Sequence, residues 1–387
     1  MKPLEGVRIL EFSTMITASF SAMMLAEQGA EVIKIESVDR PDPLRFVGTS
    51  RGGMSTLFAN CNRGKRSLTL DLKSDEGREV VEALVPTTDI VLTNYRSGVM
   101  SRLGLGSAEL RERNPRLIYL GITGYGPDGD LATAPAYDPI IQAQTGFGAV
   151  QGEGKEELEF MSTLMCDKST AYTAAQSLTA ALYQREKTGV GQHIDLAMMD
   201  SALFFLFPDS FAHHTLIDDE RPTGKSIASI ALYIYKTADG QATLSIPTQA
   251  QQLSMLSALG LDSMLSDPRF DTPESRHENR HVFYELVRST IASLPTDEVV
   301  ERLSSHDVPV AAVLDFDEVL DHPEYVANDV LNVVEHPQLG KMRQVKSPTR
   351  FGGERLEAAS PAPSLGEHNH EILEELGYDG DQIATLG

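Results

Sequence analysis

The sequence predicts an α/β protein in which a doubly wound parallel sheet forms a large domain, joined to a smaller α+β domain. The first observation is that short apolar runs alternate with helical segments along the first third of the 387-residue chain. Repeated βα units of this kind build open sheets that are covered by helices on both faces. The second observation is that the pattern changes after residue 228, where a hairpin and several helices follow. This change indicates a separate second fold.

The predicted elements of the large domain begin with a βαβ unit, in which strands at 7–12 and 30–36 flank a helix at 19–29. Further strands are expected at 67–72, 89–95 and 116–123. Further helices are expected at 75–84, near 107–113 and at 168–187, the last followed by one more strand and helix. In such Rossmann-like sheets, ligands bind beyond the carboxyl ends of the strands. We therefore expect the functional residues in the turns that follow the strands.

Changes in composition set the predicted domain bounds. The large domain covers 1–216, an acidic linker covers 217–228, the small domain covers 229–322, and 323–387 returns to the large domain as a strand and a helix. The small domain starts with a hairpin across Asp239-Gly240, a dipeptide that favours two-residue β-turns. Its helices are expected at 249–259, 279–294 and 296–305, followed by a strand at 308–314.

Composition and charge argue against several classes of partner. The formal net charge of −23 disfavours nucleic acid or an anionic membrane surface as the main partner. The two cysteines, Cys61 and Cys166, provide neither a disulfide framework nor a metal cluster. The most apolar later run, at 202–207, is far too short to span a bilayer. These observations predict a soluble, cytoplasmic protein without a metal.

Two features point to an anionic ligand, with different strength. Glu36 ends the second strand, where the ribose-binding acid of a dinucleotide site would lie. The first turn lacks the required glycines, however, and the GxGxxG at 124–129 contains Pro127 and turn residues, which indicate a loop. An NAD enzyme is therefore disfavoured. Basic residues near the strand ends instead suggest a local site for a phosphorylated ligand: Lys65, Arg66, Lys73, Arg96 and Arg102.

Asp167 stands just ahead of the predicted long helix and has two interpretations. As an N-cap, its carboxylate would accept hydrogen bonds from amides of the first helical turn. Alternatively, it is a catalytic carboxylate. The neighbouring Cys166 is another candidate nucleophile, but no histidine precedes His193, so a thiol here lacks a nearby base in the sequence.

Ordered sequence blocks along nearly the whole chain resemble the class III CoA-transferases, the family of formyl-CoA transferase and carnitine CoA-transferase. The blocks include PLEGVRILEF, NCNRGKRSLTLDLK, TNYRSGVMSRLGL and NPRLIYLGITGYGPDG, and CDKSTAYTAAQSLTAALYQREKTGVGQHIDLAMMD around Asp167. The resemblance implies an α/β large domain, a smaller second domain, and a homodimer whose chains interlock like linked rings. It also implies the reaction, which moves CoA from an acyl-CoA to a free carboxylic acid.

The resemblance assigns roles to particular residues. Asp167 matches the nucleophile of the family, and Tyr137 and Asp138 match positions that line the acyl pocket. The positions that match CoA contacts are Ile16, Thr17, Leu70, Lys73, Asn94, Tyr95, Arg102 and Met198. Succinyl-CoA is the expected donor, and a small dicarboxylic or hydroxy acid is the expected acceptor.

The sequence departs from the family pattern at places that affect the acyl substrate more than the reaction. Thr17, Ala18 and Ser19 stand where many members have Ala-Gly-Pro. Ser37 replaces an arginine that stacks on adenine in one branch. The glycine-run loop that shields the nucleophile in formyl-CoA transferase is absent, and 246–252 lies roughly at its place.

Such a transferase needs no basic side chain, because a carboxylate is normally ionised at neutral pH. We further expect the amides at the helix start to lower the pKa of Asp167. The α-methylacyl-CoA racemase branch is an alternative, since it pairs the corresponding aspartate with a histidine. Tyr137 stands at that position, and a tyrosine is a poor base at neutral pH, so the transferase is favoured. A non-catalytic CoA-binding protein is a further alternative, disfavoured because Asp167 is retained.

Overall fold

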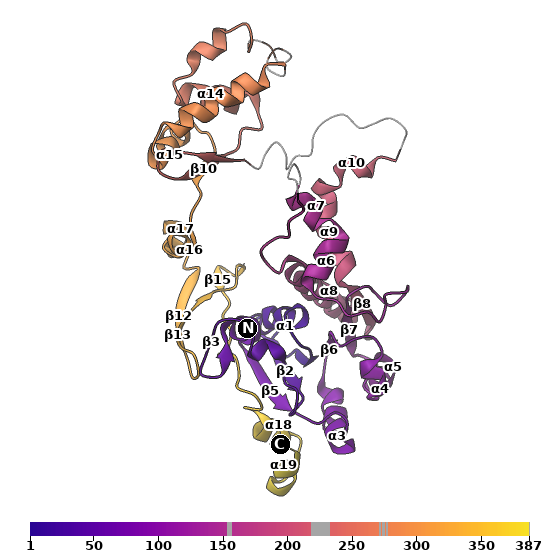
Figure 1. Ribbon diagram of the computed structural model, residues 1–387. Coiled ribbons are helices and arrows are strands. Elements are labelled where there is room, and N and C mark those ends of the chain that lie inside the picture. Colours follow the sequence, from indigo (N-terminus) through magenta and orange to yellow (C-terminus); the bar gives the residue numbers. More distant parts are fainter. Residues whose placement is uncertain (153–156, 218–232, 271, 273–274, 276–277, 387) are drawn as a thin grey trace. The chain divides into compact units, whose positions relative to one another are not determined.

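The computed structural model describes residues 1–152, 157–217, 233–270, 272, 275 and 278–386. The chain divides into two compact units (Figure 1). The first unit joins Met1–Leu206 to Tyr325–Gly387, and the second comprises Phe207–Glu324. All but the first residue of the linker predicted at 217–228 lies outside the described residues. The predicted domain bounds stay a prediction.

A six-stranded parallel sheet, with the order β5–β2–β1–β6–β7–β8, forms the centre of the first unit. Its strands are β1 Arg8–Phe12, β2 Glu31–Glu36, β5 Lys65–Thr69, β6 Ile90–Thr93, β7 Ile118–Thr123 and β8 His193–Ala197. The predicted mixed α/β fold with a parallel sheet is confirmed. The chain starts in the middle of the sheet and extends it in both directions, so a topological switch point lies between β1 and β6.

Helices cover the sheet because successive strand residues point to opposite faces. On one face, apolar strand residues such as Leu10 and Ile33 share a core with α3 Asp75–Leu84, α4 Val99–Arg102, α5 Ser107–Arg113, α18 Asn369–Glu375 and α19 Gly380–Leu386. On the other face, α1 Thr17–Glu27 packs against β1, β2 and β6 and beside α8 Met165–Thr188 (Figure 1). Gly29 follows α1 at φ +107°, where an added Cβ would lie 2.5 Å from the Cβ of Lys2.

Several short elements of the first unit were not predicted. They are the hairpin β3 Ser50–Arg51 and β4 Met54–Ser55, α2 Thr56–Asn62, α6 Asp138–Thr145, α7 Phe147–Gln151, β12 Leu331–His336, and the hairpin β14 Arg350–Phe351 and β15 Glu354–Arg355. The strand and helix expected in 323–387 are β13 Gly340–Val345, which pairs with β12, and α18. Phe58 of α2 belongs to a buried cluster with Leu339 and Ala362, which ties the C-terminal segment to the first unit. The helix expected after β8 is α9 Met198–Ser210.

The second unit is built on an antiparallel sheet of the order β11–β10–β9. Its elements are β9 Ile234–Lys236, β10 Gln241–Leu244, β11 Val310–Ala312, α12 Gln249–Ala258, α14 Arg280–Ala292 and α15 Thr296–Ser304, with the short helices α10 Ala212–Thr215, α16 Phe316–Leu320 and, at the boundary, α17 Pro323–Ala327. Asp239, in the turn between β9 and β10, accepts a hydrogen bond from the Thr296 amide at 2.8 Å and so anchors the start of α15.

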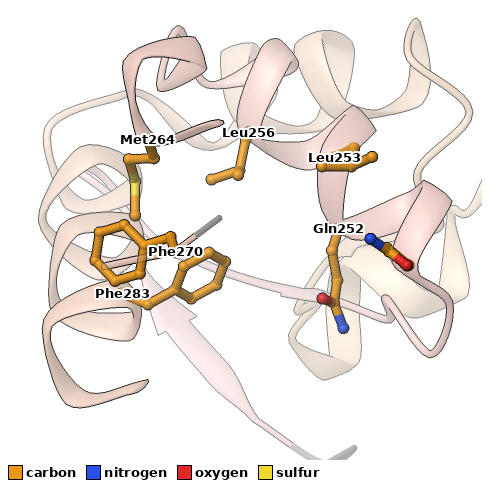
Figure 2. Close-up of a pocket in the computed structure, with 7 residues that line it drawn as sticks. Gln252, Leu253, Leu256, Met264, Phe270 and Phe283 are labelled. Carbon is orange, nitrogen blue, oxygen red and sulfur yellow. The ribbon is translucent and has the colours of Figure 1, made fainter. Parts of the chain in front are cut away.

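Leu256, Phe270 and Phe283 help to line a cavity of about 10 Å³ in the second unit (Figure 2). A volume of this size holds about one water molecule, so it is too small for a substrate.

None of the described helices combines the length and the apolar character that a bilayer span requires.

Candidate active site

The sequence-predicted CoA contacts all follow the carboxyl ends of strands. Ile16 and Thr17 come after β1, Leu70 and Lys73 after β5, Asn94, Tyr95 and Arg102 after β6, and Met198 directly after β8. Asp138 begins α6 and Asp167 lies in the first turn of α8, both in the connection from β7 to β8. These residues therefore all lie in connections that leave the carboxyl ends of strands, where open α/β sheets bind their ligands.

Helices α1 and α8 lie side by side on one face of the sheet. The two helices pack together, and the rings of Phe20 and Tyr172 meet edge to face with centroids 5.9 Å apart. At the far end of α8, Arg185 pairs with Asp89, just before β6, at 2.8 Å. The last turns of α8 therefore reach the amino edge of the sheet, and Asp167 near its start lies at the carboxyl edge, close to the switch point.

Asn94 links the turns that follow β1 and β6. Its Oδ1 accepts a hydrogen bond from the Thr14 amide at 3.0 Å, and its Nδ2 donates to the Thr14 carbonyl at 2.7 Å and to Thr17 Oγ1 at 3.0 Å. Hydrogen bonds thus join Asn94 to Thr17, and Asp138 to Asp167. Within the described ranges, no hydrogen bond or ion pair connects the other predicted site residues to one another.

The predicted cations divide into two groups. Lys73, Arg96 and Arg102 are exposed, and their side chains make no hydrogen bond or ion pair with any residue that the structure describes. Lys65 and Arg66 were expected near the ligand, but this is wrong, since they begin β5 and are already paired. Lys65 Nζ lies 2.7 Å from Glu11 Oε2, and Arg66 contacts Glu31, Glu371 and Glu375.

Glu36 is not available to bind a ribose. Its carboxylate is 2% exposed and accepts hydrogen bonds from Arg45 Nε at 2.9 Å and Arg45 Nη2 at 2.6 Å. The dinucleotide interpretation, already disfavoured by the missing glycines, therefore loses its acidic residue as well.

Asp167 is not an N-cap, so that interpretation is wrong. Helix α8 begins at Met165, with Leu164 at the N-cap and no side-chain cap. The backbone amide of Asp167 instead donates to Asp138 Oδ2 at 3.0 Å. The Asp167 carboxylate is 9% exposed and accepts no hydrogen bond from the part of the chain that the structure describes. It is thus held in place through its backbone while both side-chain oxygens are unbonded.

Burial, together with the nearby Asp138 carboxylate, raises the pKa of Asp167 to about 7. The expectation that the amides at the helix start would lower this pKa is therefore wrong. Two physical effects act in the same direction, since low polarity and a like charge both disfavour the ionised form. Asp167 therefore resists ionisation more than an exposed aspartate does.

Gln142, which the sequence analysis did not identify, supports the start of α8. Its Nε2 donates to Asp138 Oδ1 at 2.6 Å, and its Oε1 accepts from the Met161 amide at 2.9 Å. The Asp138 carboxylate, which is 1% exposed, therefore has both oxygens engaged. Tyr137 beside it is 61% exposed. The spacing of four residues between Asp138 and Gln142 places them on one helix face, and is the signal that could have indicated this pair.

Cys166 is poorly suited to act as the nucleophile. Its side chain is fully buried, and burial, with the Asp138 and Asp167 charges, raises the pKa of the thiol to about 12. Because the thiolate is the reactive form, a thiol that stays protonated at neutral pH is inert.

Among the described residues, no three His, Cys, Asp or Glu side chains gather closely enough to hold a metal ion.

Comparison with known proteins assigns the family. The family model described as CoA-transferase family III matches residues 4–369. An acyl-CoA transferase of Fusarium pseudograminearum is 31% identical, over 98% of this chain and 86% of that protein. A succinyl-CoA–D-citramalate CoA-transferase of Chloroflexus aurantiacus is 30% identical, over 100% of this chain and 97% of that protein.

The fold of the chain agrees with this match. The crystal structure of a CAIB/BAIF family protein from Brucella suis superposes with a TM-score of 0.83 at 29% identity, covering 97% of this chain and 99% of that chain. The chain thus belongs to CoA-transferase family III, a family of acyl-CoA transferases.

Proposed function

We propose that the protein transfers CoA from an acyl-CoA donor to a small carboxylic acid, with Asp167 as the nucleophile. The observation that carries this proposal is the Asp167 carboxylate, which is buried at the carboxyl edge of the sheet and accepts no hydrogen bond from the described residues. A carboxylate without hydrogen bonds or counter-charge keeps its lone pairs available for attack.

The proposed reaction uses Asp167 in two covalent intermediates. A carboxylate oxygen of Asp167 attacks the thioester carbonyl, the carbon–sulfur bond breaks, and an aspartyl–acyl anhydride and CoA thiolate result. The thiolate then attacks the aspartyl carbonyl, which releases the donor acid and leaves an aspartyl–CoA thioester. The acceptor acid repeats both steps in reverse. Because one thioester is consumed and another is formed, the reaction needs no external energy source and no redox partner.

The remaining site residues hold the substrates in this proposal. Lys73 and Arg102 bind the phosphate groups of CoA, and Asn94, Tyr95 and Met198 contact other parts of it. Ile16, Thr17 and Leu70 are buried, so Ile16 and Leu70 contribute chiefly through backbone groups. Tyr137 lines the acyl pocket, whereas Asp138, which follows it, acts there mainly by fixing the Asp167 amide.

Succinyl-CoA is the proposed donor, and a small dicarboxylic or hydroxy acid is the proposed acceptor. The relative from Chloroflexus aurantiacus, named for succinyl-CoA and D-citramalate, supports this choice. The test is to incubate the protein with succinyl-CoA and a panel of free acids in deuterated water, and to measure the molecular masses of the products by mass spectrometry. We expect a new CoA ester without deuterium. With 2-methylacyl-CoA as the substrate, rapid deuterium uptake at the α-carbon would instead identify a racemase.

Lys73→Ala and Arg102→Ala should each raise the KM for the acyl-CoA by about tenfold or more, because each removes a charge-assisted contact with phosphate. The increase should shrink at high salt, which screens exposed charges. Steady-state kinetics at low and high ionic strength measure both effects. Lys187→Ala is the matched control, since this exposed lysine lies in the last turn of α8. An unchanged KM in both site variants would remove these residues from the proposal.

We also propose that two chains form an interlocked homodimer. The first unit exposes large apolar side chains that a partner chain would cover, including Phe204 at 81%, Phe205 at 54% and Tyr183 at 67%. Linked rings bury far more than a standard interface of about 1,600 Å², and they separate only by extensive unfolding. Sedimentation at nanomolar concentration should therefore show a dimer. A species of monomer mass under these conditions would contradict interlocking.

A further inference from the structure

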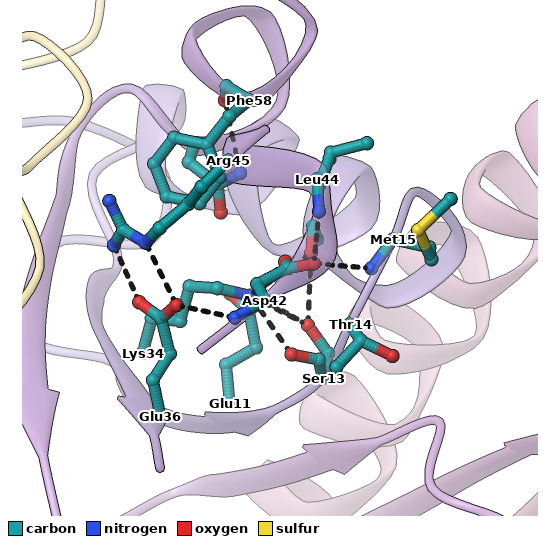
Figure 3. Close-up of polar contacts among 12 residues, drawn as sticks. Glu11, Ser13, Thr14, Met15, Lys34, Glu36, Asp42, Leu44, Arg45 and Phe58 are labelled. Carbon is teal, nitrogen blue, oxygen red and sulfur yellow. Dashed lines mark hydrogen bonds and ion pairs between the residues drawn. The ribbon is translucent and has the colours of Figure 1, made fainter. Parts of the chain in front are cut away.

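Six ionisable side chains are buried beneath α1 and beside the switch point, and we call them the buried ion cluster: Glu11, Lys34, Glu36, Asp42, Arg45 and Lys65. Figure 3 labels all of them except Lys65. All are at most 4% exposed. Lys34 Nζ lies 3.0 Å from Glu11 Oε1 and 3.1 Å from Asp42 Oδ2. Although burial opposes it, Lys34 and Lys65 lower the pKa of Glu11 to about 2, so this carboxylate is charged.

Such a cluster needs an explanation other than stability. Removing charges from water is expensive, and well-packed apolar residues often stabilise a core as well as a buried ion pair does. A buried network can instead fix one particular local conformation, which is a hypothesis to be argued for each protein. The hydrogen bonds of this cluster indicate which conformation it fixes.

The cluster holds the turn 13–17, which follows β1. Lys34 Nζ donates to the carbonyl and to the hydroxyl of Ser13, both at 3.1 Å. Asp42 Oδ1 accepts a hydrogen bond from the Met15 amide at 2.9 Å. Met15 adopts φ +62°, in the left-handed region. A residue other than glycine is disfavoured there by about 1–2 kcal/mol, so its neighbours must hold it in place.

Asp42 is itself rigidly fixed, as Figure 3 shows. Its Oδ1 also accepts from the Leu44 amide at 2.9 Å, and its own amide donates to Glu36 Oε1 at 3.0 Å. Arg45 in turn binds Glu36 through two hydrogen bonds. A continuous set of buried contacts thus runs from the end of β2 to the turn 13–17.

The turn 13–17 occupies the place at which dinucleotide-binding sheets carry a glycine-rich turn. Here it contains no glycine. Asn94 fixes the opposite side of the turn through Thr14 and Thr17. The turn is therefore held by the buried ion cluster on one side and by Asn94 on the other.

We propose that Asp42 is a positioning residue for CoA: together with Lys34 it keeps the turn 13–17 in the shape that receives the ligand. This inference rests on the proposed function, because the turn is taken to contact CoA. Asp42→Asn retains one acceptor oxygen, but its amide NH₂ would face the Lys34 ammonium, donor against donor. The turn would then spend part of its time in other conformations, and ligand affinity falls in proportion to the competent fraction.

The experiment measures CoA binding by calorimetry and the KM for acyl-CoA, in the full-length wild type and in Asp42→Asn. We expect the dissociation constant and the KM to rise about tenfold, while kcat at saturation changes by less than about twofold, since bound CoA restores the turn. Hydrogen exchange should also become faster at the Met15 amide. The matched control is Asp89→Asn, which makes the same change in an ion pair with Arg185 at the other edge of the sheet.

The outcomes separate this inference from the proposed function. If the wild type binds no CoA, the proposed function fails. If it does bind, and Asp42→Asn matches it in affinity and in Met15 exchange, the positioning role is overturned. Equal losses in Asp42→Asn and Asp89→Asn would also overturn it, because the effect would be general destabilisation. If Asp42→Asn does not fold, Ser13→Ala decides by the same readouts, since it removes only the contacts of the Ser13 hydroxyl with Lys34, Glu11 and Ser19.

Discussion

Asp167→Asn should lose essentially all CoA transfer, with turnover falling by about 10⁴-fold or more, as for other essential nucleophiles. The amide has nearly the same shape but cannot form the anhydride. Asp167→Ser should lose activity as well. Both variants should keep the start of α8 in place, because the backbone contact to Asp138 Oδ2 does not involve the replaced side chain. Product formation from succinyl-CoA, followed by mass spectrometry, measures the loss. Asp195→Asn, an exposed aspartate in β8, is the matched control.

The loss of activity should not come with a loss of stability. The pKa of Asp167 is raised to about 7 in the folded protein, so its protonated form contributes stability that is present below the ordinary pKa of 3.8 and is lost as the pH rises through 7. The asparagine side chain of the variant does not ionise, so it is not subject to this loss. The melting temperature of Asp167→Asn should therefore equal or exceed that of the wild type at pH 8, and the difference should narrow toward pH 5. An inactive variant that melts earlier at pH 8 would point to a structural role.

Asp138→Asn should shift the acid limb of the pH–rate profile to lower pH. The negative charge of Asp138 adds to burial in raising the pKa of Asp167, so its removal lets Asp167 ionise at lower pH. In the wild type, kcat/KM should fall about fivefold between pH 7 and pH 6 and about tenfold for each further pH unit below that, as protonation removes the nucleophile. In the variant, the same fall should begin at lower pH.

The plateau of Asp138→Asn should also be lower than that of the wild type. Asp138 accepts hydrogen bonds from both the Asp167 amide and Gln142 Nε2, and an asparagine offers only one acceptor oxygen. One of these donors then faces an NH₂ group, which loosens the start of α8. Asp195→Asn again serves as the control and should leave the profile unchanged. A profile that keeps its midpoint near pH 7 in Asp138→Asn would show that the nearby charge does not tune the nucleophile.

The parallel sheet was predictable because short, largely apolar runs alternate with helical segments along the first third of the chain. The start of β5 was not predictable, because in the sequence Lys65 and Arg66 look like solvated residues that precede a strand. They belong to the strand, since Lys65 finds Glu11 on β1 and Arg66 finds Glu31 on β2. A charged side chain can be buried only where a partner of opposite charge lies beside it. Here the partners are distant in the sequence, so a local sequence pattern does not reveal them.

The candidate site was likewise predictable only in part. The sequence placed Asp167 at the start of a helix, but not its position inside the first turn, because Leu164 at the N-cap carries no capping side chain. The contact that fixes Asp167 comes from Asp138, on α6. Burial, together with the Asp138 charge, raises the pKa of Asp167, which was expected to be lowered. The buried ion cluster was equally hidden, since Asp42 and Arg45 lie in a segment without helix or strand periodicity.

The most direct test of the nucleophile is to trap its covalent intermediate. The protein is incubated with succinyl-CoA and no acceptor acid, treated with hydroxylamine, digested, and examined by peptide mass spectrometry. Hydroxylamine attacks the aspartyl carbonyl of the anhydride or thioester and releases the leaving group. We expect a hydroxamate on Asp167, in the peptide that contains MCDKST, and none in Asp167→Asn. A succinyl group on Cys166 in a sample digested without hydroxylamine, or no hydroxamate on Asp167 while the wild-type protein turns over, would contradict Asp167 as the nucleophile.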